Sequence, residues 1–423
     1  MMKTASDLMR TLKSEEGMRR LAQLYGCREG EMARQLERYM HLLKRHADLF
    51  GGDVAPLIVS APGRTELCGN HTDHNNGLVM AAAVNLDTVA AVTKRDDLRV
   101  NLYSEGFPPV QIDLSDLSMA PAEQGTPASI IRGVAFKLQE MGLTIGGFDA
   151  AATSNVLTGS GLSSSAAFEV MIVAVFDALY NGMRVDAVRR AEISQFAENA
   201  YFGKPSGLMD QMASSVGGLV AIDFRGAPQV TPMQMDLSGY SLVVVNTGGS
   251  HDDLTADYAA VRAEMQAVAR CFGEETLRAV RPEQLWHDMA RVRAAAGDRA
   301  VLRAFHYFNE NDRVRDLIKA VQAGDTEGFK RILIESGRSS WMYLQNVYAN
   351  PANQSLCVAL SMAEFMLRDC GAWRVHGGGF AGTTLNVVPV DQEERFVHHM
   401  NEVFGDYACH VLSIRREGAA IVF

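Results

Sequence analysis

Residues 15–50 carry apolar side chains at helical spacing between charged positions, which predicts a helical segment early in the chain. The recurring apolar positions are Leu21, Leu24, Leu36, Tyr39, Leu42 and Leu43. From residue 57 to residue 114 the pattern changes to valine-rich runs such as PLIVSAPG and LDTVAAVTKRDD, bounded by Gly, Pro, Asn and Asp. The sequence therefore predicts a helical lead-in followed by a group of β-strands.

Beyond residue 125, helical and strand patterns follow one another without a fixed period. The predicted helices cover residues 129–141, 165–181 and 186–202, a short segment within 203–218, most of 252–348, residues 353–371 and a segment from residue 392. The predicted strands cover residues 148–154, 219–224 and 241–249, with closing strands near the C-terminus. The long apolar helix at 165–181 follows a glycine-serine loop, so that loop leads directly into a helix N-terminus.

A chain of 423 residues exceeds what one hydrophobic core usually covers, so we expect two domains. Because strands and helices are mixed in both halves without regular βαβ alternation, the predicted class is α+β, with a boundary near residues 215–245. We divide the chain into a helical lead-in at 1–55, a first domain at 56–230 and a second domain at 231–423. The sequence has no repeats and no low-complexity linker, so we expect the halves to pack tightly and to bind a ligand between them.

Composition and charge narrow the function classes. The chain is 47% hydrophobic and 21% charged, as ordinary globular proteins are, and its formal net charge of -10 argues against a nucleic-acid surface. Six cysteines without CxxC spacing predict neither a zinc site nor a disulfide framework. The N-terminus lacks a signal-peptide core, and the apolar stretch at 170–176 is too short to cross a bilayer. We expect a soluble cytoplasmic protein, monomeric or weakly homo-oligomeric, that binds small molecules and neither nucleic acid nor membrane.

The loop LTGSGLSSSAAFEV carries Gly159 and Gly161 just before the serines that open the long apolar helix. The glycines let the backbone approach a ligand, while free N–H groups and the helix dipole face the same point. This combination predicts an anion site, and we expect the anion to be phosphate. The alternative is an ordinary serine-capped helix after a turn. The loop has neither the GK[ST] of a Walker loop nor the GxGxxG of a dinucleotide fingerprint.

A second polar loop, KPSGLMDQMASS, places Asp210 in the first turns of a short helix that follows a Pro-Ser-Gly turn. The partial charge of the helix N-terminus and any nearby cation would keep this carboxyl group ionised. An ionised, fixed aspartate suits a proton acceptor for a substrate hydroxyl. The alternative is an acidic residue that only stabilises the helix N-terminus.

A third loop, HGGGFAGTT, contains three consecutive glycines at 377–379 and another at 382. Glycine permits positive φ, so this backbone is able to pack closely against a ligand or another loop. A simple tight turn is the alternative.

The stretch PGRTELCGNHTDHNNG gathers many hydrogen-bonding groups beside a proline-glycine turn. The turn projects Arg64, and Asn70, His71 and Asp73 offer donors and acceptors over four residues. Such a cluster matches the hydroxyl-rich face of a small polar ligand, which has little apolar surface to bind. A metal site built from His71, Asp73 and His74 is one alternative, although no third histidine follows at metal-ligand spacing. A plain structural loop is the other.

These four motifs together resemble the GHMP kinases, because PGRTELCGNHTDHNNG, GSGLSSSAAFEV, GLMDQ and GGGFAG follow the order and approximate spacing of that family. The first motif is similar to the galactokinase signature. The resemblance extends over about residues 56–423. It implies a two-domain GHMP kinase fold, with a first domain similar to the second domain of ribosomal protein S5, a ferredoxin-like second domain, and the active site between them.

The resemblance also implies a role for each matching residue. Asp210 would be the catalytic base, with Arg64 beside it, and Ser165 and Glu198 would hold Mg²⁺. The implied sugar contacts are Asn70, His71, Asp73, Gly207 and Tyr258. The implied ATP contacts are Gly159, Ser160, Gly161, Leu162, Ser163, Ser164, Ser165, Gly378 and Gly379.

The chain departs from the galactokinase pattern in its first motif. Galactokinases have Gly-Glu-His-Thr-Asp-Tyr where this chain has Gly-Asn-His-Thr-Asp-His at 69–74, and Asn-Leu-Ile where it has Glu66-Leu67-Cys68. The replaced glutamate is a sugar ligand in the family. Asn70 offers an amide instead of a carboxylate, which changes the hydroxyl pattern that the site satisfies. A mismatched buried polar group costs about 1–3 kcal/mol, enough to change specificity between epimers.

The resemblance implies an ATP-dependent sugar kinase that phosphorylates galactose or a galactose-like sugar at the anomeric hydroxyl. A first alternative is a GHMP kinase for another small acceptor, such as a uronic acid or an amino sugar. A second is a catalytically silent regulator that binds sugar and ATP without turnover.

Overall fold

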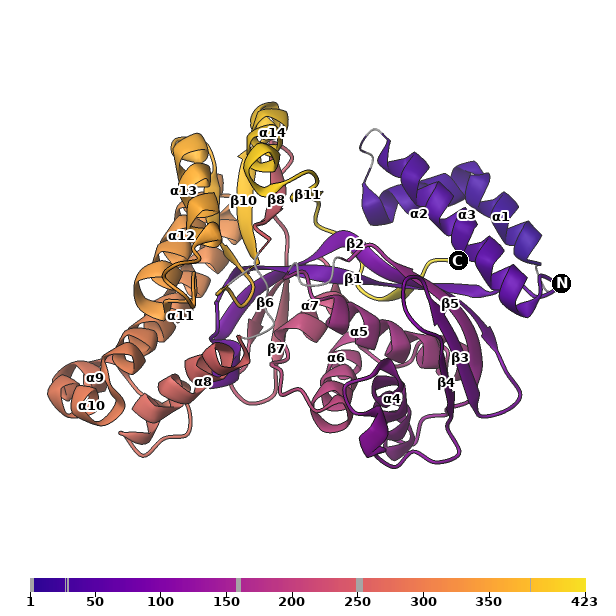
Figure 1. Cartoon of the computed structure of the whole chain (residues 1–423), viewed down its shortest axis with the longest axis horizontal. Coiled ribbons are helices and arrows are strands. Elements are labelled where there is room, and N and C mark those ends of the chain that lie inside the picture. Colours follow the sequence, from indigo (N-terminus) through magenta and orange to yellow (C-terminus); the bar gives the residue numbers. More distant parts are fainter. Residues whose placement is uncertain (1–3, 27, 29, 157–160, 249–253, 381) are drawn as a thin grey trace.

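A computed structural model of the chain describes residues 4–26, 28, 30–156, 161–248, 254–380 and 382–423. Figure 1 shows two lobes, each built around a β-sheet. The strands are β1 (Leu57–Cys68), β2 (Leu78–Lys94), β3 (Arg99–Ser104), β4 (Val110–Asp113), β5 (Phe148–Ser154), β6 (Leu219–Asp223), β7 (Gln229–Met233), β8 (Tyr240–Asn246), β9 (Ala372–His376), β10 (Thr383–Pro389), β11 (Cys409–Leu412) and β12 (Ala420–Ile421). The first sheet has the order β12-β1-β2-β5-β3-β4, with β6 paired to β2 and β7 paired to β6. The second has the order β11-β8-β10-β9.

Fourteen α-helices in the described residues pack around these sheets. They are α1 (Ala5–Lys13), α2 (Glu15–Tyr25), α3 (Glu31–Phe50), α4 (Pro127–Glu140), α5 (Ser164–Phe176), α6 (Ala187–Phe196), α7 (Met209–Val216), α8 (Thr255–Arg270), α9 (Pro282–His287), α10 (Met289–Ala296), α11 (Asp298–Ala323), α12 (Thr326–Ser339), α13 (Ser355–Leu367) and α14 (Glu393–Phe404). The predicted helices and strands are all present. The sequence pattern missed α1, whose N-cap is Thr4 in a capping box with Asp7.

The first sheet is covered on both faces (Figure 1). On one face, Val59 of β1 and Ala90 of β2 pack against α4 and α5. On the other face, the neighbouring residues Ile58 and Val89 pack against α1, α2 and α3. Successive side chains of a strand point to opposite faces, so a sheet buried on both sides has continuous apolar strands. The helical lead-in therefore forms the second layer over this sheet.

The second sheet carries α13 and α14 on one face, where Val243 and Val375 meet Leu360 and Phe396. Its other face meets α11 and α12 in a core that also includes β1 and β2 residues of the first lobe. The two lobes therefore share an apolar cluster, in agreement with the tight packing that the absence of a linker in the sequence predicts. β7 spans the predicted division between residues 230 and 231 and belongs to the first sheet. The exact division of the chain into domains stays a prediction.

The end of the chain returns to the first lobe. β12 pairs antiparallel with β1, and the Val422 N–H donates to the Ile58 carbonyl at 2.7 Å. Nearby, the buried carboxylate of Asp87 accepts hydrogen bonds from Arg38 of α3 and from Arg415, at 2.7 and 2.8 Å. The first sheet and α3 are thus joined to residues close to the C-terminus.

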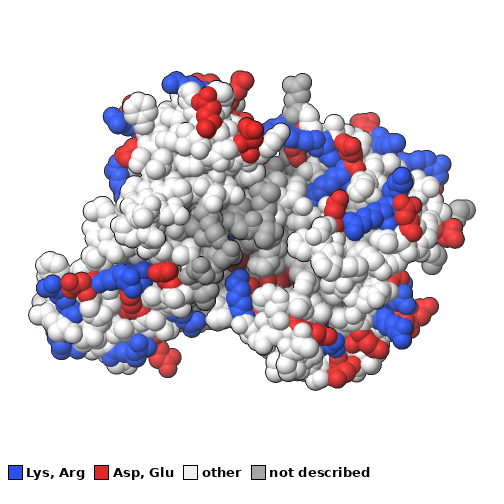
Figure 2. All heavy atoms as spheres, in the orientation of Figure 1, with Lys and Arg blue, Asp and Glu red and all other residues white. Residues whose placement is uncertain are grey.

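Helix α5 is a core helix. The segment Ser164–Asn181 is long and apolar enough to cross a membrane, but 67% of it is buried inside the protein. Figure 2 shows basic and acidic side chains interspersed over both lobes, so the described residues on this face form no continuous basic stripe.

Candidate active site

The centre of the site is an ion pair between Arg64 of β1 and Asp210 in the first turn of α7. Arg64 Nε donates to Asp210 Oδ1 at 2.7 Å, and the Ser163 hydroxyl donates to Oδ2. The Asp210 side chain is 32% exposed while the Arg64 side chain is 7% exposed, so the carboxylate faces open space over a buried guanidinium. Burial by itself would raise the pKa of Asp210, but Arg64 and Ser163 hold that pKa below its usual value. The arrangement provides an ionised proton acceptor in a fixed position.

The glycine-serine loop lies directly against this ion pair. Arg64 donates from its backbone N–H to the Leu162 carbonyl at 3.1 Å and from its guanidinium to the Gly161 carbonyl. Gly161 has φ +71°, and a Cβ there would lie 2.9 Å from Thr383 Oγ1, so this position requires glycine. Ser164 begins α5 and Ser165 is exposed beside it. Residues 159 and 160, also predicted to bind phosphate, lie outside the described residues.

Glu198 is buried in the helical turn Ala197–Phe202 that follows α6. Its carboxylate accepts from Lys204 Nζ at 3.0 Å, from Gln211 Nε2 at 2.8 Å and from the Ser206 hydroxyl. The Lys204 ammonium group thus occupies a cation position beside this carboxylate. Sequence reasoning identified Glu198 but missed these partners, because they lie on a loop and on α7.

A second buried carboxyl group, Glu169 of α5, lies next to Glu198. Gln211 Nε2 donates to Glu169 Oε2 at 3.0 Å and so bridges the two residues. Burial and the charge of Glu198 raise the pKa of Glu169 to about 8. Sequence reasoning missed Glu169 as a site residue, although its position four residues after Ser165 places both on one face of α5.

These groups fit the predicted magnesium site. Mg²⁺ prefers carboxylate and hydroxyl oxygens as ligands. Glu169 lies one helical turn from Ser165 on α5, and Glu198 supplies a second carboxylate through the Gln211 bridge. Gln211 Oε1 is buried beside them and has no hydrogen-bond partner among the described residues. An unpaired oxygen next to two carboxylates is an environment suited to a cation.

His71 and Tyr258, two predicted sugar contacts, meet across the two lobes. Their rings stack with centroids 6.4 Å apart, and each donates a hydrogen bond to the triple-glycine loop. His71 Nε2 donates to the Gly378 carbonyl at 2.9 Å, and the Tyr258 hydroxyl donates to the Gly379 carbonyl at 2.7 Å. Burial lowers the pKa of His71 to about 4, so this imidazole is neutral at pH 7. Gly378 and Gly379, predicted to contact ATP, therefore lie against the predicted sugar residues.

Asp73 and Gly207 are in direct contact. A Cβ on Gly207 would lie 1.8 Å from Asp73 Oδ2, so a side chain at position 207 would collide with this carboxylate. Burial and the nearby charge of Asp210 raise the pKa of Asp73 to about 6. Asp73 and Asp210 are thus close enough for their charges to repel, as expected of two groups that line one site.

Asn70, another predicted sugar contact, is engaged by protein groups. Its side chain is buried and its amide donates to Glu66 Oε1 at 3.0 Å and to the Gly377 carbonyl at 2.7 Å. Its oxygen accepts from Asn346 Nδ2 at 2.8 Å. The donors and acceptors of Asn70 are therefore directed into the interface between the lobes.

The metal alternative for the first motif is not supported. Within the described residues, only His398, His399 and Glu402 on α14 bring three ligand atoms within 4.8 Å of one another. His71, Asp73 and His74 form no such group. His74 Nδ1 instead accepts from Asn75 Nδ2 at 3.0 Å.

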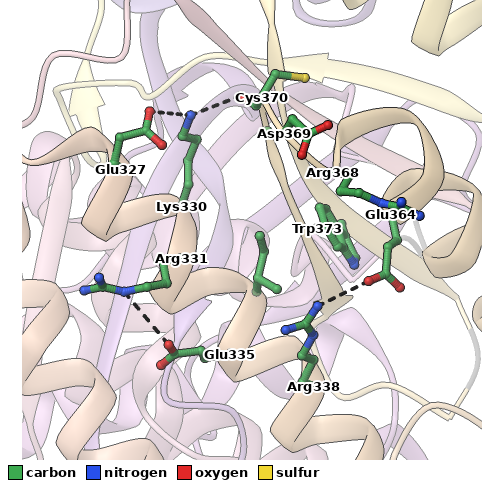
Figure 3. Close-up of a pocket in the computed structure, with 12 residues that line it drawn as sticks. Glu327, Lys330, Arg331, Glu335, Arg338, Glu364, Arg368, Asp369, Cys370 and Trp373 are labelled. Atoms are coloured by element: carbon green, nitrogen blue, oxygen red, sulfur yellow. Dashed lines mark hydrogen bonds and ion pairs between the residues drawn. The ribbon is translucent and has the colours of Figure 1, made fainter.

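A separate hollow of about 410 Å³ lies between α12, α13 and the start of β9. Figure 3 shows ion pairs among its charged side chains, including Lys330 with Glu327 at 2.7 Å and Arg338 with Glu364 at 3.2 Å. The triple-glycine loop follows the opposite end of β9, so this hollow is not part of the predicted site.

Comparison with known proteins agrees with this geometry. Residues 44–94 match the galactokinase galactose-binding signature, and residues 129–218 match the GHMP kinases N terminal domain. The galactokinase of Actinobacillus pleuropneumoniae serotype 5b (strain L20) is 33% identical over 361 residues, covering 84% of this chain and 90% of the relative. The galactokinase of Homo sapiens is 32% identical, covering 88% of this chain and 93% of the relative.

Solved structures show the same fold. The structure of Lactococcus lactis galactokinase complexed with galactose has a TM-score of 0.79 and 25% identity, covering 91% of this chain and 100% of that chain. The mevalonate kinase of Methanococcus jannaschii has a TM-score of 0.62 at 12% identity, covering 85% of this chain and 98% of that chain. The fold and the site together define a GHMP kinase of two α+β domains, as predicted. Within that class, the chain belongs to the galactokinase family and is a sugar kinase.

Proposed function

We propose that this protein transfers the γ-phosphoryl group of ATP to the anomeric hydroxyl of galactose or a galactose-like sugar. The observation that carries the proposal is the ionised Asp210, which Arg64 and Ser163 hold in place. Asp210 lies between the glycine-serine loop and the loop after β1 that contains Asp73. A proton acceptor located between a phosphate loop and a hydroxyl-binding loop is what phosphoryl transfer to an alcohol requires.

In this proposal Asp210 accepts the proton of the anomeric hydroxyl. The hydroxyl oxygen of the sugar bonds to the γ-phosphorus as the bond between that phosphorus and ADP breaks. Arg64 keeps the carboxylate ionised and offsets negative charge that develops on the transferring group. The N-terminus of α5, with Ser163, Ser164 and Ser165, faces the phosphates with its N–H groups. We assign residues 159 and 160 to the same loop.

We further propose that Ser165 and Glu198 hold Mg²⁺, with Glu169 beside them. The ion, when bound, neutralises charge on the β- and γ-phosphates. Lys204 is expected to move away from Glu198 when the ion binds, because both cations need the same carboxylate.

For the acceptor, we propose a neutral sugar bound by His71, Asp73 and Tyr258, with Gly207 leaving room for it. A uronic acid would bring a third carboxylate next to Asp73 and Asp210, which disfavours that alternative. The silent-regulator alternative is disfavoured because the proton acceptor, its arginine and the buried carboxylates are all in place. The five described cysteines are free thiols, which supports a cytoplasmic location.

The test is ADP release with ATP and Mg²⁺ across galactose, its epimers, galacturonic acid, N-acetylgalactosamine and mevalonate. We expect galactose or a neutral relative to be turned over best. Asp210→Asn should lower kcat by about 10²–10⁴-fold, because it removes the proton acceptor and keeps the shape. Equilibrium binding of ATP to the variant should be retained. Undiminished turnover by Asp210→Asn would refute the assigned base, and sugar binding without turnover by the unsubstituted protein would favour the regulator.

A further inference from the structure

Two of the four positions at which the first motif departs from the galactokinase pattern, Glu66 and Asn70, are hydrogen-bonded to each other. Asn70 Nδ2 lies 3.0 Å from Glu66 Oε1 and 3.2 Å from Oε2. The family has an amide at position 66 and a carboxylate at position 70, so this chain carries the same two groups with their positions exchanged. A carboxylate at either position requires a donor at the other, because two facing carboxylates would repel.

The exchanged pair is tied to the second lobe through buried partners. Arg374 of β9 is fully buried and donates from Nη2 to Glu66 Oε1 at 2.7 Å. The Asn70 amide donates to the Gly377 carbonyl, and the Asn70 backbone carbonyl accepts from His306 Nε2 at 2.9 Å. Every one of these contacts joins the end of β1 and the loop after it to an element of the second lobe.

The same network holds the triple-glycine loop. Asn346 is fully buried, and its Nδ2 donates to Asn70 Oδ1 at 2.8 Å and to the Gly378 carbonyl at 3.0 Å. The Gly378 carbonyl also accepts from His71, and the next carbonyl accepts from Tyr258. The positions of His71 and Tyr258 therefore depend on where Asn70 and Asn346 hold this loop.

From these contacts we propose that Asn70 is a positioning residue and not a sugar ligand. With Glu66 it forms an amide–carboxylate strut, anchored by Arg374, that sets the triple-glycine loop and through it His71 and Tyr258. The strut takes the place of the sugar contact expected at position 70. The sugar is therefore bound by His71, Asp73 and Tyr258. This inference rests on the proposed sugar kinase function for its kinetic part only.

The test is a double-mutant cycle of isosteric changes: Glu66→Gln, Asn70→Asp and the pair together. Asn70→Asp alone sets two carboxylates and the Gly377 carbonyl against one another, so it should lower Tm by at least ~5 °C. The double variant restores one amide–carboxylate bond and should recover part of that loss. If the Tm shift of the double variant equals the sum of the shifts of the two single variants, the strut is overturned. This arm needs no substrate, so it stands even if no sugar is turned over.

The kinetic arm separates positioning from contact. Asn70→Asp should raise the sugar KM by at least tenfold and be partly rescued by Glu66→Gln. The ATP KM should rise less, because the loop holds only two of the predicted ATP contacts, Gly378 and Gly379. For each singly deoxygenated galactose, the substitution should raise KM by the same factor as it does for galactose. One deoxy sugar that is insensitive to the substitution would reveal a hydrogen bond from Asn70 to that hydroxyl and overturn the inference.

A second variant covers the case in which Asn70→Asp does not fold. Asn346→Ser removes the donor to Asn70 and to Gly378 without adding charge. We expect it to raise the sugar KM several-fold and the ATP KM by a smaller factor. Unchanged values of both constants would overturn the assigned role of the network.

Discussion

Asp73 and Asp210 line one site, yet the protein moves their pKa values in opposite directions. Asp73 has burial and the Asp210 charge against its ionised form, so its pKa rises to about 6. Asp210 has Arg64 and Ser163 in favour of its ionised form, so its pKa falls. Two carboxyl groups whose environments separate their pKa values are suited to different roles. This separation supports the proposed roles of Asp73 as a hydrogen-bonding group for the sugar and of Asp210 as the proton acceptor.

This separation predicts a pH-dependent sugar KM. Below about pH 6 Asp73 carries a proton and is a weaker acceptor for a sugar hydroxyl, while Asp210 stays ionised. The sugar KM should therefore fall about tenfold between pH 5 and pH 7, measured from initial rates at saturating ATP. Asp73→Asn should give a higher KM with a flat profile. A wild-type KM that does not change over this range would contradict the assignment.

Site residues were predictable where they lie in motifs that follow the order of the family and carry the side chains that the chemistry requires. Arg64 and Asp210 are far apart in sequence, yet the family pattern predicted that they lie side by side, and they do. The hydrogen bond from Ser163 to Asp210 was not predicted. The true surroundings of Asn70 were not predictable, because Glu66 is its neighbour in sequence but Gly377 and Asn346 reach it only through packing of the lobes. Glu169 was missed because its partner Gln211 lies on another helix.

At the scale of elements, α5 combines two functions in one helix. Its first turn contains the last serines of the glycine-serine loop. Ten of its thirteen residues are buried. Glu169 is one of these buried residues, so the carboxyl group that we propose to lie beside the Mg²⁺ ion belongs to an otherwise apolar buried face. The cost of ionising Glu169 is reflected in its raised pKa.

This cost should appear as a pH-dependent stability in the presence of a chelator. In the unfolded chain a glutamate titrates near about 4.3, whereas folded Glu169 titrates at about 8. Between these values the native state binds the extra proton, so this group lowers stability as pH rises from about 4.5 to 8. Glu169→Gln cannot ionise and should flatten the fall of Tm between pH 5 and pH 8.5. Identical slopes for the two proteins would argue against a protonated Glu169.

Most elements were predicted because their patterns are strong. The continuous apolar runs of β1 and β2 follow from burial on both faces. α1 was missed because a nine-residue helix offers few repeats of the helical period, although its capping box was readable in the sequence. The sequence did not predict that residues 15–50 cover the second face of the first sheet. Amphipathicity shows that a helix packs against something, but it does not identify the surface on which the helix packs.

At the scale of the whole molecule, Asp87 joins the lead-in helices, the first sheet and the C-terminal residues. Its fully buried carboxylate is paired with Arg38 and Arg415 and also accepts from the Tyr25 and Ser60 hydroxyls. Removing the charge of a buried carboxylate leaves its arginines without compensation.

Asp87→Asn should therefore destabilise the protein by about 3–5 kcal/mol in urea unfolding. Asp312→Asn is the matched control, because Asp312 pairs with Arg315 on the exposed surface and its loss should matter little. Equal effects of the two substitutions would show that the Asp87 cluster does not hold the helices and the C-terminal residues to the sheet.

The pairing of β12 with β1 has a consequence for synthesis on the ribosome. β1 precedes the other described strands in the chain, but its partners Arg415, Ala420 and Ile421 are translated only after the second lobe. At about 5–20 residues per second, the first sheet waits on the order of 10–40 s between completion of β7 and arrival of β12. During that interval a nascent chain exposes the unpaired edge of β1, so this edge is where we expect a chaperone to be needed.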